Sequence, residues 1–205
     1  MTQASSLAEL LRGVIKSERV LRAIASVPRD RFVPAGEQER AYENVALPIG
    51  CEQTISQPLV VARMLELLEL EAGDRVLDVG TGSGYHAALL ALLAGEVWTI
   101  ERHAELSAEA EHTIRGLGIE NVRFVVGDGS GGLPERAPFD AINVAAATGA
   151  GVPAALCDQL GTGGRLVAPV GVDGQRLTLL RRTRGRLETT TLEPVRFVPL
   201  IVPEQ

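Results

Sequence analysis

The stretch that most constrains the fold is a strand that runs directly into closely spaced glycines and then into a helical run. Residues 76–86 read VLDVGTGSGYH, and an alanine- and leucine-rich run continues to Ala94. Gly80, Gly82 and Gly84 let the backbone approach a ligand with no side chain in the way. The first N–H groups of the following helix then face that ligand. In nucleotide-binding sheets this turn lies at the carboxyl edge of the first strand, so the pattern predicts an α/β fold with a ligand there.

Two acidic residues at later strand ends predict the rest of a binding crevice. The strand at 96–100 ends in Glu101, about 20 residues past the first glycine, where nucleotide folds place a carboxylate that accepts hydrogen bonds from the ribose hydroxyls. The strand at 122–126 runs into Asp128, within reach of an adenine amino group. The alternatives are a solvated strand end at Glu101 and an ordinary turn at Asp128. Together the three strand ends predict a crevice for an adenosine-bearing cofactor.

The glycine spacing distinguishes between cofactors. A dinucleotide turn has the spacing G-x-G-x-x-G, which leaves room for a pyrophosphate. Here the glycines alternate with single residues and follow Asp78. An acid at this position repels a pyrophosphate and suits a cationic amino-acid end, which favours S-adenosylmethionine over NAD. The alternative for Asp78 is a hydrogen bond to the backbone N–H groups of the turn.

Strand and helix patterns alternate through the rest of the chain. This alternation, followed by a hairpin, predicts a doubly wound, Rossmann-like sheet that is mostly parallel, with an antiparallel edge and helices on both faces. The pattern leaves the order of the last two strands open. We expect strands at 139–145 and 164–170, a helix at 153–160, and a hairpin formed by 175–182 and 187–198.

Composition argues against several other classes of function. The formal net charge is −6 with no basic block, and aromatic residues make up 3%, so we expect no nucleic-acid partner. The cysteines, Cys51 and Cys157, and the three histidines show no metal-binding spacing. We see no signal-peptide pattern and no apolar run long enough to span a bilayer. We therefore expect a cytoplasmic protein with one domain over 1–205.

The N-terminal quarter is expected to cover the sheet. Residues 1–58 would contain two helices and a covering segment, and residues 59–205 the Rossmann-like core. Ser6 and Glu9 resemble a capping box for the first helix. The second helix is predicted at 18–26, followed by an irregular link at 29–34.

Residues 42–58 show no clear period before an amphipathic helix at 59–70. A stretch of this length without regular structure is usually functional when it lies inside a compact domain. Ser56 within it has two interpretations. It either caps the helix, with Pro58 in the first turn, or directs its hydroxyl toward the glycine crevice.

Motifs along almost the whole chain resemble those of the protein-L-isoaspartate O-methyltransferase family, a class of S-adenosylmethionine-dependent repair enzymes. The glycine turn is common to many methyltransferases, whereas the motifs around Ser56 and near the C-terminus are more specific. The motifs are ALPIG at 46–50, QTISQP at 53–58, VGTGSGY at 79–85, GDG at 127–129, APFDAI at 137–142, GGRLVAPVG at 163–171 and VRFVPL at 195–200.

The resemblance implies roles for individual residues. Ser56 would be the active-site residue, the 195–200 strand would help hold the peptide, and the substrate would be an isoaspartyl protein or peptide bound by a monomer. The implied substrate-binding residues are Thr54, Ser56, Val195, Phe197 and Val198. The implied cofactor-binding residues are Ile49, Gly50, Asp78, Gly80, Gly82, Gly84, Glu101, Arg102, Asp128 and Gly129.

The implied chemistry is methyl transfer to the free α-carboxylate of an isoaspartyl residue. That carboxylate is already ionised at neutral pH, so no general base is needed. Some positions depart from the family pattern, and two of them, Glu52 and Asn143, favour the alternative of another acceptor. The other alternative is a non-catalytic or nicotinamide-binding protein on the same sheet, which the glycine spacing and Asp78 oppose. The departing residues are Glu52, His86, Ser130, Asn143 and Ala145.

Overall fold

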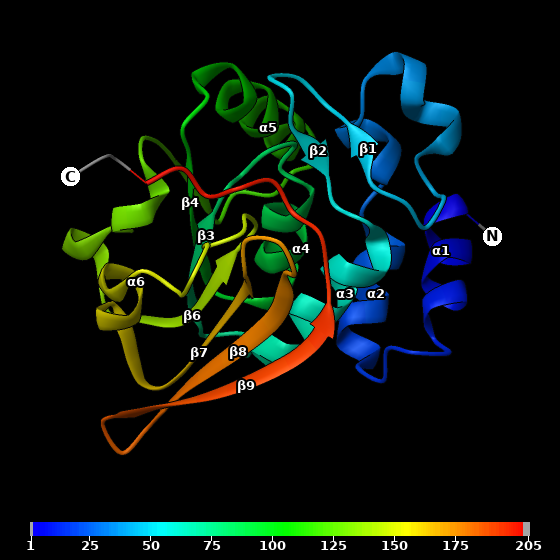
Figure 1. Cartoon of the computed structure of the whole chain (residues 1–205). Helices are drawn as coiled ribbons and strands as arrows, with labels where there is room; N and C mark the ends of the chain where they lie inside the picture. Colours follow the sequence, from blue (N-terminus) through cyan, green and yellow to red (C-terminus); the bar gives the residue numbers. More distant parts are fainter. Residues whose placement is uncertain (1, 203–205) are drawn as a thin grey trace.

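The computed structural model describes residues 2–202 and is built on a seven-stranded sheet (Figure 1). The strand order is β5-β4-β3-β6-β7-β8-β9, so the chain starts in the middle of the sheet and turns outward in both directions. β8 runs antiparallel to β7 and β9, while the pairs among β3 to β7 are parallel. This confirms the predicted sheet and orders its last two strands. The strands are β3 (Arg75–Val79), β4 (Glu96–Glu101), β5 (Val122–Val126), β6 (Phe139–Val144), β7 (Leu160–Val170), β8 (Arg176–Thr183) and β9 (Arg186–Pro194).

Both faces of the central parallel strands are buried, as parallel strands require, whereas β9 at the edge is largely exposed. Successive residues of a strand point to opposite faces. Val76 accordingly packs in an apolar cluster with α1 to α4, while Leu77 packs in a second cluster with α6. The carboxyl ends of the central strands are therefore held from both sides.

The helices cover the two faces unequally. Figure 1 shows α1 and α2 at the opposite side of the molecule from α6. α4 is apolar around its circumference, and eight of its nine residues are buried because it lies between the N-terminal helices and the sheet. The second face carries α6 and short 3-10 turns. The helices are α1 (Gln3–Leu11), α2 (Glu18–Ser26), α3 (Pro58–Leu68), α4 (Tyr85–Leu93), α5 (Ala104–Gly116) and α6 (Ala154–Asp158).

The start of α1 differs from the prediction. Thr2, not Ser6, is the N-cap, and its Oγ1 accepts a hydrogen bond from Ser5 N at 3.1 Å. The predicted capping box of Ser6 and Glu9 is therefore wrong, because the helix already begins at Gln3. α2 has the predicted bounds, and the link after it forms two 3-10 turns, Arg29–Phe32 and Ala35–Arg40.

The end of the hairpin also differs from the prediction. β9 stops at Pro194, which has no N–H to continue the ladder, so residues 195–198 are irregular instead of a strand. The chain then pairs with the loop after β6: Ala147 N donates to Val198 O, and Leu200 N donates to Ala147 O, both at 2.8 Å. The C-terminal segment is thereby brought back over the carboxyl ends of the strands. Within residues 2–202, no helix combines the length and apolar character needed to cross a membrane.

Candidate active site

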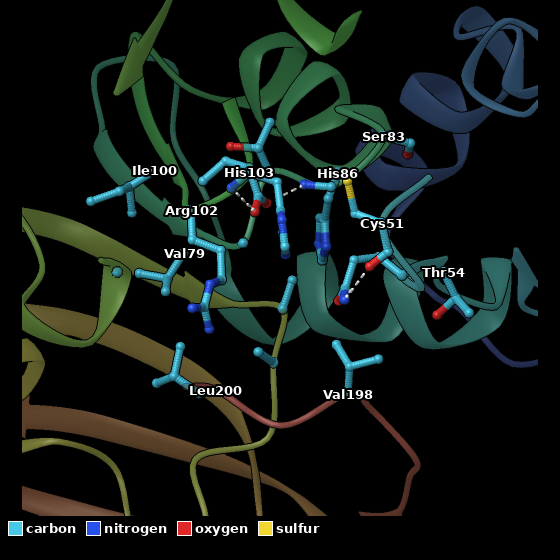
Figure 2. A pocket seen from close by; sticks show the side chains of 18 of the residues that line it. Cys51, Thr54, Val79, Ser83, His86, Ile100, Arg102, His103, Val198 and Leu200 are labelled. Carbon is cyan, nitrogen blue, oxygen red and sulfur yellow. Dashed lines mark hydrogen bonds between the residues drawn. The ribbon is translucent and has the colours of Figure 1, made fainter. Parts of the chain in front are cut away.

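A cavity of about 850 Å³ lies at the carboxyl ends of the central strands (Figure 2). Most of its wall comes from five places: residues 51–56, the glycine turn with the start of α4, the ends of β4 and β5, residues 145–146 after β6, and residues 198–201. Glu101 and Asp128 both line it, so the two predicted acids share one cavity.

The glycine turn forms one wall through its first two glycines. Gly80 and Gly82 line the cavity with φ of +94° and +51°, a conformation that favours glycine. Gly84 has another role. A Cβ at Gly84 would lie 2.8 Å from the Cβ of Ala110, so this glycine allows α5 to pack against α4 and does not line the cavity.

The carboxylate of Glu101 is held firmly at the end of β4. Its Oε2 accepts a hydrogen bond from Gly82 N at 2.9 Å, and its Oε1 accepts one from His103 N at 3.0 Å. The residue is 6% exposed. Glu101 is therefore fixed to the glycine turn and is more than a solvated strand end.

Asp128 combines a structural and a cavity-lining position. Its Oδ1 accepts a hydrogen bond from Ser130 N at 2.8 Å, which is the turn geometry considered as the alternative. The residue nevertheless lines the cavity together with Gly129. A Cβ at Gly129 would lie 2.6 Å from Val79 Cγ1, so a side chain is excluded there.

Asp78 does not take either position considered from the sequence. It is fully buried and does not line the cavity, and its carboxylate accepts hydrogen bonds from side chains, not from the turn backbone. Thr99 Oγ1 donates to Oδ2 at 2.8 Å and Asn143 Nδ2 donates to Oδ1 at 2.7 Å. Burial raises the pKa of Asp78 to about 6. Direct charge contact between Asp78 and a ligand is thus not supported by its position.

The covering segment is a short two-stranded ribbon followed by Ser56. β1 (Leu47–Pro48) pairs with β2 (Thr54–Ile55), and Ser56 follows β2 and lines the cavity. Asn44 satisfies the start of α3, because its Oδ1 accepts a hydrogen bond from Leu59 N at 3.0 Å. The helix-cap interpretation of Ser56 is therefore wrong, and the residue belongs to the cavity wall.

Arg29 holds the covering segment and was not identified from the sequence. It is fully buried, and its guanidinium donates to the carbonyl oxygens of Ala41, Val45 and Ser56. Burial lowers its pKa to about 10. The one signal in the sequence is an arginine between two prolines, which does not reveal what the guanidinium contacts.

The remaining predicted residues divide between the cavity and the packing around it. Thr54, Arg102 and Val198 line the cavity. Ile49, Gly50, Val195 and Phe197 lie outside the lining; a Cβ at Gly50 would face Leu106, and Phe197 N donates to Gln175 Oε1. Within residues 2–202 no group of three His, Cys, Asp or Glu side chains is arranged to hold a metal ion. The cavity also includes lining residues that sequence analysis did not select: Cys51, Gln53, Ile55, Val61, Tyr85, His103 and Leu200.

Comparisons with known proteins show which family the chain is similar to. A relative from Koribacter versatilis, named protein-L-isoaspartate O-methyltransferase, is 53% identical over 91% of this chain and 84% of its own length. A relative of the same name from Erwinia tasmaniensis is 49% identical over 95% of this chain and 93% of its own length.

Solved structures of the same description share the whole fold. One, a protein-L-isoaspartate O-methyltransferase, has a TM-score of 0.86 and 31% identity; the match covers 95% of this chain and 64% of that one. A putative enzyme of this kind from Plasmodium falciparum, in complex with S-adenosyl-L-homocysteine, has a TM-score of 0.86 and 27% identity over 98% of this chain and 99% of that one. The model of the family described as protein-L-isoaspartate(D-aspartate) O-methyltransferase matches residues 3–205, and the chain therefore belongs to that family.

Proposed function

We propose that this chain transfers a methyl group from S-adenosylmethionine to the free α-carboxylate of L-isoaspartyl residues in damaged proteins and peptides, and so initiates their repair. The observation that carries the proposal is that Glu101, Asp128 and Ser56 line one open cavity. The names of the relatives and of the family do not favour a different acceptor or a non-catalytic role.

The cavity fits the methyl donor by size and by chemistry. Its volume of about 850 Å³ lies within the usual range for small-molecule sites. Glu101 would accept hydrogen bonds from the ribose, Asp128 and Gly129 would flank the adenine, and Gly80 and Gly82 would lie along the amino-acid part. The bound donor supplies an electrophilic methyl group on a positively charged sulfur.

The residues of the chain contribute orientation and shielding from water. The isoaspartyl carboxylate is ionised at neutral pH, so no side chain has to remove a proton from it. Ser56 would donate a hydrogen bond that aims one carboxylate oxygen at the methyl carbon, at about 3 Å. The covering segment would exclude water, which makes the carboxylate a better nucleophile.

A paired-peptide assay tests this function. Purified protein is incubated with donor carrying a tritiated methyl group and either an isoaspartyl peptide or its aspartyl twin. We expect a base-labile methyl ester on the isoaspartyl peptide alone. Equal labelling of both peptides, or of neither, would refute the proposal.

Substitution of Ser56 tests its assigned role. We expect Ser56→Ala to lower kcat for the isoaspartyl peptide by about tenfold or more, which corresponds to one hydrogen bond to a charged group. The affinity for S-adenosylhomocysteine should stay unchanged. Ser26→Ala, at the exposed end of α2, is the matched control. Unchanged kcat in the Ser56 variant would exclude an orienting role.

We also propose that the enzyme acts as a monomeric, one-domain protein in the cytoplasm. Free thiols at Cys51 and Cys157 are consistent with a reducing compartment. Size-exclusion chromatography with light scattering checks the monomer, and a dimer mass would contradict it.

A further inference from the structure

Three polar side chains form a row across the middle of the apolar sheet. Asp78 on β3 is in register with Thr99 on β4 and with Asn143 on β6. Each is fully buried. Because residues in register point to the same face, the row faces α4, where His86 lies in the first helical turn. His86 Nδ1 is 3.3 Å from Asn143 Nδ2, which completes a connected chain from Asp78 to the histidine.

The hydrogen bonds of this chain fix the tautomer of His86. The Asp78 carboxylate only accepts, so the Asn143 atom 2.7 Å from it is the amide nitrogen. That nitrogen has a second hydrogen, which points at His86 Nδ1. Nδ1 must therefore accept, and the ring proton lies on Nε2. Burial lowers the pKa of His86 to about 3, so the ring is neutral at physiological pH.

The Nε2–H group of His86 is a buried donor without a partner among the described residues. The residue is 6% exposed and Nε2 has no hydrogen-bond partner there. Leaving such a group unpaired is costly, which is why nearly all buried donors are paired. His86 also lines the cavity, so an acceptor that enters from the cavity side can pair with Nε2 once the packing that covers this buried atom shifts.

The position of His86 indicates which part of a ligand it meets. In the view of Figure 2, Ile100 lies at one side of the cavity, Thr54 at the other, and His86 lies between them. The Ile100 side leads into Glu101, assigned above to the ribose. The strongest hydrogen-bond acceptors of the two substrates are their carboxylates, one on the amino-acid end of the donor and one on the isoaspartyl residue.

We propose that His86 Nε2–H is a preset hydrogen-bond donor to a carboxylate in the cavity, and that Asn143 and Asp78 are positioning residues that fix its tautomer. This inference rests on the proposed function, which brings both carboxylates into the cavity. A neutral donor of this kind recognises a carboxylate without adding a positive charge beside the sulfonium of the methyl donor.

Binding measurements on His86→Phe test the contact. Phenylalanine keeps a ring in place but removes the donor, whereas His86→Gln retains an N–H donor. We expect His86→Phe to change either the affinity for S-adenosylhomocysteine or the peptide KM by about tenfold or more, which corresponds to the loss of one hydrogen bond to a charged group. His86→Gln should keep most of the wild-type affinity and KM. If the donor carboxylate is bound, calorimetry shows weaker S-adenosylhomocysteine binding but unchanged binding of 5′-methylthioadenosine, which lacks the amino-acid end. If His86 binds the isoaspartyl carboxylate, the peptide KM rises, while the affinities for S-adenosylhomocysteine and for 5′-methylthioadenosine stay unchanged.

Nitrogen NMR of the ring tests the tautomer independently of activity. With three histidines in the chain, His86 can be assigned by substitution. We expect an Nε2–H signal in the wild type that shifts on ligand binding, and loss of the fixed tautomer in Asn143→Leu. An Nδ1–H tautomer would overturn the inference. Unchanged affinity and KM in a folded His86→Phe protein would also overturn it, because a bound water would then be the partner of Nε2–H. Failure of the paired-peptide assay with these ring signals intact would refute the function instead.

Discussion

Replacement of Arg29 should separate peptide binding from donor binding. The guanidinium donates to three carbonyl groups that lie 12, 16 and 27 residues further along the chain, at Ala41, Val45 and Ser56. Ser56 is the residue assigned to the substrate carboxylate. Arg29→Met keeps most of the apolar stem and removes the donors. The covering segment would then lose its hydrogen bonds to the 3-10 turn after α2.

The size of the effect follows from two opposing terms. A hydrogen bond from a charged donor contributes about 1.5–3 kcal/mol, and three carbonyls lose such a donor. Burying the guanidinium costs several kcal/mol, which the variant recovers. We therefore expect a net loss of about 2–4 kcal/mol in the free energy of unfolding, below the sum of the three bonds.

The kinetic effect should be selective. Glu101 is held by Gly82 and His103, which Arg29 does not contact, so S-adenosylhomocysteine affinity should change by less than about threefold. A looser Ser56 should lower kcat/KM for the peptide by roughly tenfold, equivalent to about 1.4 kcal/mol of lost orientation.

Urea unfolding, calorimetry and peptide kinetics on the same preparations measure the three quantities. Arg22→Met on the exposed side of α2 is the matched control, because within residues 2–202 the Arg22 side chain donates only to the carbonyl oxygen of Glu18 in its own helix. Equal losses of donor and peptide affinity in the folded Arg29 variant, or no loss of stability, would refute the reasoning.

Three further predictions concern the glycine turn and the two buried acids. Gly84→Ala should lower the free energy of urea unfolding by about 1–3 kcal/mol, because its Cβ would lie 2.8 Å from that of Ala110. The affinity for the methyl donor should stay unchanged, and a loss of affinity would indicate that Gly84 contacts the ligand. Glu101→Gln should weaken S-adenosylhomocysteine binding in calorimetry by roughly tenfold or more, as one charge-assisted hydrogen bond is lost, and equal affinity would exclude the ribose role. The pKa of Asp78 is raised to about 6 from 3.8, so the folded state binds the proton more tightly than the unfolded state. The resulting contribution to the free energy of unfolding is fully present below pH 3.8 and is lost as pH rises through 6. Between pH 3.8 and pH 6 the free energy of unfolding of the wild type should fall by up to about 3 kcal/mol relative to that of Asp78→Asn. Parallel curves of unfolding free energy against pH for the two proteins would contradict this.

The parts of the site that sequence reasoning located are those set by local pattern. A strand that ends in glycines or an acid places that residue at the carboxyl edge whatever the rest of the chain does. Glu101 and Asp128 therefore come together because parallel neighbouring strands end at the same edge. The order of the last two strands was not accessible, because a hairpin can join either edge of a sheet without a change in its own pattern.

The misplaced residues depend on contacts between distant segments. Gly84 has the same local surroundings as Gly82, and only the approach of α5 distinguishes them. Asp78 looks like a ligand contact until the register of three strands shows its side chain facing α4. Arg29 carries no local signal because its three partners are carbonyl groups, which every residue has.

One strand connects the buried polar row to the cavity wall. Thr99 and Glu101 are two residues apart on β4 and so point to the same face. Thr99 donates to Asp78 in the interior, while Glu101 accepts from Gly82 at the cavity. A shift of β4 along the sheet would disturb both bonds together. The carboxylate of Glu101, which we propose binds the ribose, and the proposed chain from Asp78 to His86 therefore depend on the same strand register. Through this coupling Asp78 would affect the geometry of the site without contact with a ligand.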